Sequence, residues 1–162
     1  MSTKRSADRA NKPGRLNDLK VECFMLAGAT HVVDGLFYVL GGGIDRVVFS
    51  DFPGSLDATA LVRIVVPFTE TNQTIQFEVR VVDEDGTNIL PGDFKPSMAV
   101  GRPVHLQRGE SQGVNFPLGF TNIQIPHPGP YTVELRHDDR IIATTGFTAA
   151  PLTLDQLLGR YG

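Results

Sequence analysis

The sequence predicts an all-β fold, a sandwich of about eight or nine short antiparallel strands. Segments in which apolar and polar residues alternate recur along the chain, separated by turn signals every 8–12 residues or so. Seventeen glycines and eleven prolines in 162 residues favour a chain with frequent turns. Helical patterns do not alternate with these segments, which disfavours a parallel α/β sheet.

Composition excludes several classes of protein. Hydrophobic residues make up 41% and charged residues 20%, the balance of a globular domain. The net charge of −3 argues against nucleic acid as a partner. The single cysteine, Cys23, lies in an apolar run, and we interpret it as a small buried hydrophobe. We find no signal-peptide pattern and no apolar stretch of about 18 residues, so we expect no membrane insertion and a cytoplasmic location, with a virion or cytoplasmic particle equally compatible.

Residues 1–17 are polar and basic, with a Pro13-Gly14 breaker. They hold too little apolar surface to offset the entropy of ordering, so we expect a flexible arm. The arm is either a solvated tail or a segment that orders on a partner, which would be an acidic protein surface or, less favoured, a nucleic acid. Its candidate partner-binding residues are Lys4, Arg5, Arg9, Lys12 and Arg15.

The first strands are predicted at 20–27 and 36–40, with an Asp34-Gly35 turn signal between them. Gly41-Gly42-Gly43 follows, and three glycines between strand-like segments indicate a bulge or a sharp crossing from one sheet to the other. Another strand is expected at 44–49.

Two segments with a period of two, 61–68 and 75–82, predict a hairpin closed by the polar residues 69–73. Residues 87–112 are irregular, with room for a short strand around 103–107. A strand is expected over 114–125. A last hairpin joins 131–136 to 141–147 through a turn at 137–140.

The predicted domain spans residues 18–149 and is followed by a tail, 150–162. Thr153 is a suitable N-cap for a short C-terminal helix that ends at Gly159. So short a helix is marginal in water, so it must dock on its own domain or on a partner. Its apolar stripe, a second candidate partner-binding set, consists of Leu154, Leu157 and Leu158.

Residues 128–135, with Gly129 and Tyr131, resemble the penultimate strand of immunoglobulin-like domains, where a tyrosine corner occurs. Residues 19–149 also resemble a bacterial family of unknown function. That likeness rests on residues 34–45, the Phe52-Pro53 loop, the 81–86 turn and the 129–131 strand start. The resemblance implies an immunoglobulin-like β-sandwich, no established activity and no catalytic residues.

Motifs for specific chemistry are weak. Asp83-Glu84-Asp85-Gly86 is similar to a calcium loop, but Phe94 stands where an EF-hand needs its final Glu. Asp45 or Asp93 could complete a site at a loop tip, but an acidic hairpin turn is the favoured interpretation of the motif. The histidines show no zinc spacing, and we interpret His127 and His137 as exposed loop residues.

No nucleophile elbow or phosphate-binding loop is present in the sequence, so we expect no enzyme and no cofactor. An enzyme would need a cleft that gathers residues such as His31, Asp34 and Asp45. The leading hypothesis is a non-enzymatic structural or protein-interaction subunit, which binds a protein partner or its own copies through its termini or a strand edge. The alternative is a module that binds carbohydrate or calcium.

Overall fold

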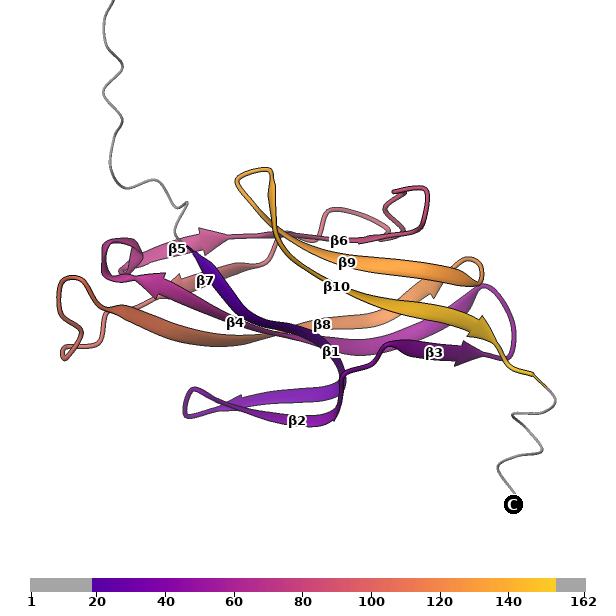
Figure 1. The fold of residues 1–162 in the computed structure, drawn as a ribbon, viewed down its shortest axis with the longest axis horizontal. Coiled ribbons are helices and arrows are strands. Elements are labelled where there is room, and N and C mark those ends of the chain that lie inside the picture. The colour runs from indigo at the N-terminus through magenta and orange to yellow at the C-terminus, as the bar shows by residue number, and fades with distance from the viewer. Residues whose placement is uncertain (1–18, 154–162) are drawn as a thin grey trace, which may run out of the picture.

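A computed structural model describes residues 19–153 and confirms the all-β prediction (Figure 1). Within that range there is no α-helix, only a 3₁₀ turn, η1 (Phe68–Glu70). The sequence predicts eight or nine strands, and residues 19–153 form ten. They are β1 (Lys20–Val33), β2 (Leu36–Gly42), β3 (Arg46–Phe49), β4 (Gly54–Pro67), β5 (Gln73–Gln76), β6 (Glu78–Val82), β7 (Ser97–Val100), β8 (Ser111–Ile125), β9 (Gly129–His137) and β10 (Arg140–Pro151).

The strands form two four-stranded sheets and one two-stranded sheet. The first sheet has the order β2-β1-β4-β8, and the second has the order β3-β10-β9-β6. β5 and β7 pair with each other. All pairs are antiparallel except that of β3 with β10, which is parallel.

One hydrophobic core lies between the two larger sheets. Alternate residues of β4, among them Val62 and Ile64, are fully buried, as are alternate residues of β9, such as Val133 and Leu135. These belong to a single cluster that also includes residues of β6, β8 and β10. The period of two in the sequence therefore marks the faces that meet between the layers.

Two local predictions are confirmed. β9 and β10 form the last hairpin, and its turn residues Asp138 and Asp139 have φ values of 47° and 60°. Such left-handed conformations are typical of a tight hairpin turn. The glycine run carries the chain from β2 in the first sheet to β3 in the second, and Gly41 and Gly43 have φ values of 60° and 81°.

The predicted hairpin between 61–68 and 75–82 is wrong. β4 pairs with β1 and β8, whereas β6 pairs with β9 in the other sheet. The connection is a crossover anchored at η1: the Thr71 hydroxyl donates to the Phe68 carbonyl (2.7 Å), and the Arg102 guanidinium lies 3.9 Å from the centroid of the Phe68 ring. Alternation of apolar and polar residues identifies a strand, but it does not show which strand is its neighbour or which sheet it joins.

Other boundaries also differ. The short strand lies at Ser97–Val100 rather than around 103–107, because its partner is β5. β10 continues to Pro151, two residues past the expected domain end, because β3 pairs with it as far as Phe49. The basic arm and the predicted C-terminal helix beyond Thr153 lie outside the described residues.

Candidate functional site

The β1–β2 hairpin is the most unusual part of the fold. β1 pairs with β4 only as far as Ala27, and from there on it pairs with β2. At the tip of the hairpin, the Asn115 side-chain amide of β8 donates to the Gly35 carbonyl (2.7 Å). The strand therefore bends sharply, and the hairpin returns along the outer face of the first sheet (Figure 1).

One face of the hairpin is turned toward that sheet. Thr30 and Val32 lie opposite Val39 and Phe37, and Thr30 is buried. Leu61 has the outward phase of β4, yet it is only 3% exposed, which is consistent with the hairpin covering it. Packing and the bond from Asn115 thus hold the hairpin as a platform.

The opposite face is apolar and open to solvent. Residues directly opposite each other in a hairpin share a face. This face carries three such pairs, Ala29 with Leu40, His31 with Tyr38 and Val33 with Leu36. The large side chains are well exposed: Leu36 by 62%, Tyr38 by 57% and Leu40 by 71%. We call this face the hairpin patch; its residues are Ala29, His31, Val33, Leu36, Tyr38 and Leu40.

The edge of β2 is also open. Within residues 19–153, β2 has β1 as its only strand partner. A terminal strand presents a row of unpaired N–H and C=O groups, which can accept a strand from another chain. An apolar face and an open edge therefore coincide on one hairpin.

We expect Asn115→Ala to loosen the hairpin without unfolding the domain. The substitution removes the bond to Gly35 and the one that the Arg63 guanidinium donates to the Asn115 side-chain oxygen (3.0 Å). A neutral hydrogen bond contributes roughly 0.5–1.5 kcal/mol. Amide hydrogen exchange should accelerate in β2 and not in β9. Equal acceleration in both strands would contradict a local role.

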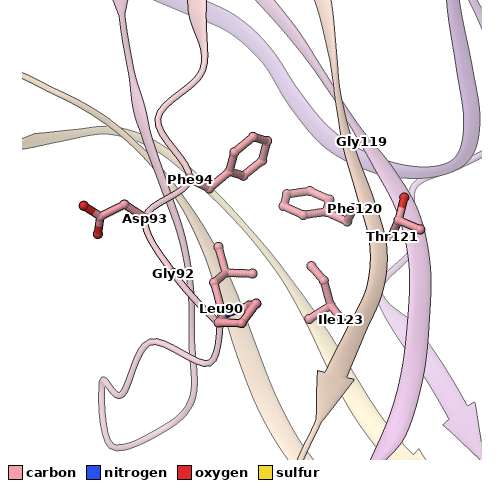
Figure 2. A pocket seen from close by; sticks show the side chains of 9 residues that line it. Leu90, Gly92, Asp93, Phe94, Gly119, Phe120, Thr121 and Ile123 are labelled. Carbon is pink, nitrogen blue, oxygen red and sulfur yellow. The ribbon is translucent and has the colours of Figure 1, made fainter.

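A second feature is an apolar groove of about 360 Å³ (Figure 2). It lies between the 90–94 loop and β8. Phe94 and Phe120 meet edge to face with their ring centroids 5.9 Å apart, and Leu90 and Ile123 line the space below them. The Asp93 carboxylate points away and pairs with the Lys95 ammonium (2.7 Å), which lowers the pKa of Asp93. The groove suits an apolar group.

A smaller, polar cleft of about 250 Å³ has His137 in its lining. The expectation that His137 is exposed is wrong. His137 is not an exposed loop residue. It ends β9 and is 8% exposed, because its ring packs beside Phe77 and its Nδ1 lies 2.7 Å from the Gln76 carbonyl oxygen. The burial could not be predicted from sequence, because the neighbouring Asp138 and Asp139 are typical of an exposed turn. The loop position predicted for His127 is right, since it lies at a bend, but the residue is half-buried rather than exposed.

The groups proposed from sequence for a calcium site or an enzyme cleft are not brought together, although His127 Nε2 lies 3.8 Å from Asp83 Oδ2. Asp83 caps its own turn, accepting bonds from the backbone N–H groups of Asp85 (3.1 Å) and Thr87 (2.8 Å). Over residues 19–153, no three His, Cys, Asp or Glu side chains form a group that could hold a metal ion. Asp45 and Asp93, and likewise His31 and Asp34, are therefore not gathered into such a site.

The partner-binding residues proposed from sequence lie outside the described part of the chain: Lys4, Arg5, Arg9, Lys12, Arg15, Leu154, Leu157 and Leu158. The sequence analysis missed the hairpin patch. The sequence did contain a signal, because residues 36–40 are apolar on both faces of the strand. Only one of these faces packs against the first sheet, so the other is left apolar and exposed.

Comparison with known proteins agrees with the extent of the fold. A family model matches residues 22–150, which runs from within β1 to within β10 and includes the hairpin. The chain belongs to DUF6941, a family of unknown function. No curated protein matches this DUF6941 chain. In residues 19–153, no helix has the length and apolar character needed to cross a membrane.

Proposed function

We propose that this protein is a non-enzymatic assembly subunit that docks to another protein chain through the β1–β2 hairpin. The observation that carries the proposal is the coincidence of the hairpin patch with the open edge of β2. Strand addition would supply main-chain hydrogen bonds, and the exposed leucines and tyrosine would supply apolar contact. Monomeric proteins seldom expose such contiguous apolar faces.

We further propose that the scaffold is an immunoglobulin-like sandwich. In that topology strands A, B and E share one sheet, and C, F and G share the other. Here β1-β4-β8 and β6-β9-β10 are in the corresponding positions. The Tyr131 hydroxyl, near the start of β9, donates to the His127 carbonyl (2.8 Å), as a tyrosine corner does.

A charge-insertion experiment tests the docking surface. The double substitution Leu36→Lys/Leu40→Lys places two ammonium groups on the patch, where burial against a partner would desolvate them. We expect the full-length variant, expressed at its native level, to lose the complex that the wild type forms. Native mass measurement of affinity-purified material reports the change.

The matched control is Val104→Lys/Ile141→Lys, which adds the same charge at two other exposed apolar positions. It should leave the complex intact, and both variants should melt within a few degrees of the wild type. An unchanged complex in the hairpin variant would overturn the proposal. Deleting residues 154–162 distinguishes docking through the hairpin from docking through the Leu-rich tail. Docking through the hairpin predicts that the complex survives this deletion.

The setting that we propose is a bacterial cytoplasm. The single thiol, Cys23, is half-buried and unpaired, which fits a reducing compartment. The bacterial origin rests on the resemblance of residues 34–45 and the other motifs described above.

A ligand-binding module is the second candidate function, and the groove between the 90–94 loop and β8 favours it. Its lining is apolar, so an acyl or aromatic group suits it better than carbohydrate or calcium. Such a ligand should raise the melting temperature of the wild type, and Phe120→Ser should abolish the shift. No shift across fatty acids and aromatic acids would count against this function.

A further inference from the structure

The terminal strands of the larger sheets differ in how they are protected. β3 is four residues long and carries Arg46. β6 carries Glu78 and Arg80, and bridges from Phe94 and Asn88 cover it. These are ordinary ways of preventing one sheet from pairing with another, and a proline is a third. β8 contains one, Pro117, which lies opposite Leu61 of β4.

β2 has none of these devices. It is seven residues long, and it contains no charge, no proline and no register shift in its pairing with β1. The absence of charge continues through Ile44. Among the four terminal strands, it is therefore the one built to remain available for pairing.

We propose that the strand which covers β2 is β2 of a second copy, paired antiparallel about a two-fold axis at Tyr38. This rests on the proposed function and names its partner. The segment 35–41 reads Gly-Leu-Phe-Tyr-Val-Leu-Gly, which is nearly the same in both directions. Antiparallel pairing about Tyr38 sets Leu36 against Leu40 of the other copy, and the left-handed Gly35 and Gly41 (φ 75° and 60°) mark the ends of the paired segment.

Every apolar side chain of β2 then meets an apolar one. Tyr38 meets its own copy, and Phe37 lies opposite Val39. A two-fold contact uses one patch on both chains, so the surface must complement itself, and a segment with this symmetry does so. No like charges face each other, because β2 carries no charge.

The directions of the backbone N–H and C=O groups of β2 agree with this axis. Val33 and Leu36 close a two-residue turn, so Leu36, Tyr38 and Leu40 direct their N–H and C=O groups toward β1. Those of Phe37 and Val39 point to the open edge. A two-fold axis at Tyr38 pairs Phe37 with Val39 of the other copy, which satisfies these free groups. The two first sheets would become one continuous sheet.

A cysteine at the axis tests the register. In such an antiparallel pair the two Cα atoms at position 38 would be about 4.5 Å apart, which is within the range of a disulfide. In a Cys23→Ser background, Tyr38→Cys should give a cross-linked dimer under mild oxidation. Ile141→Cys, at a site 50% exposed on β10, is the matched control and should remain mostly uncross-linked.

Charge pairing tests the identity of the partner. Tyr38→Lys and Tyr38→Asp should each be monomeric by light scattering where the wild type is dimeric, since each sets like charges face to face. An equimolar mixture should restore the dimer. A wild-type mass of one chain up to about 1 mM, where even a millimolar Kd would register, would overturn the second-copy proposal, as would no excess of cross-linking over Ile141→Cys.

The two proposals fail separately. If the purified wild type is monomeric while Leu36→Lys/Leu40→Lys loses its native complex, the second copy is wrong and hairpin docking stands. If that double variant keeps its native complex, hairpin docking itself is wrong. Circular dichroism and melting of each variant show that any loss of mass is a loss of association rather than of folding.

Discussion

Replacing Gly54 by alanine is expected to lower the free energy of unfolding by about 1–3 kcal/mol. Gly54 is the buried first residue of β4, and a Cβ atom there would overlap the ring of Phe49. That ring is 8% exposed and packs edge to face on Phe52, with centroids 5.5 Å apart. It has little room to move, because Phe49 also ends the pairing of β3 with β10. Chemical denaturation measures the loss.

Gly119→Ala is the matched control. Gly119 lies in β8, and a Cβ atom there would have no heavy atom within 4 Å. A methyl group at this position reduces the freedom of the unfolded chain without a clash, so stability should be unchanged or slightly higher. Equal losses in the two variants would show that the close approach of Gly54 to Phe49 is not the cause.

Replacing Tyr131 by phenylalanine is expected to destabilise the fold by about 1–2 kcal/mol. The side chain is 1% exposed, and its ring stacks on Phe147 with centroids 5.3 Å apart. Burial raises the pKa of Tyr131, so the hydroxyl keeps its proton and donates to the His127 carbonyl. Phenylalanine keeps the stacking and removes both polar contacts of the hydroxyl with His127, the bond to the carbonyl and the 3.3 Å contact with Nδ1, so the variant isolates the contribution of the hydroxyl.

Tyr38→Phe provides the comparison, since Tyr38 is 57% exposed in the single chain. Because the side chain is largely exposed, loss of its hydroxyl should change stability by less than about 0.5 kcal/mol at protein concentrations that favour the monomer. If Tyr131→Phe has as small an effect, the tie between His127 and β9 does not stabilise the fold, and the support for an immunoglobulin-like corner is weakened.

The strands that could be predicted from sequence are those with one buried and one solvated face. The last hairpin is the clearest, because Tyr131, Val133 and Leu135 alternate with polar residues on one side of a two-aspartate turn. The crossing at Gly41 to Gly43 was also predictable, because a run of glycines allows left-handed conformations that other residues rarely adopt. Two of these glycines, Gly41 and Gly43, have such conformations.

Pairing could not be predicted. The segments 61–68 and 75–82 are close in sequence and regular in pattern, yet 61–67 lie in β4 of the first sheet, 78–82 form β6 of the second, and 75–76 belong to β5 of the two-stranded sheet. A strand buries its apolar face equally well against either layer, so alternation carries no information about the neighbour. The contacts of Phe68, Thr71 and Arg102 that hold the crossover are formed by residues about 30 positions apart.

The sequence by itself determined the fold class, the position of most strands and the turns, because these depend on residues within a few positions of one another. Only the tertiary structure decided that β1 bends after Ala27 and lays the hairpin back on its own sheet, since that arrangement depends on a bond from Asn115, 80 residues away, and on the burial of Leu61. The same apolar residues, 36–40, would be core in one arrangement and surface in another. Their exposure at an open edge, which is the basis of the proposed function, follows from where the rest of the chain packs.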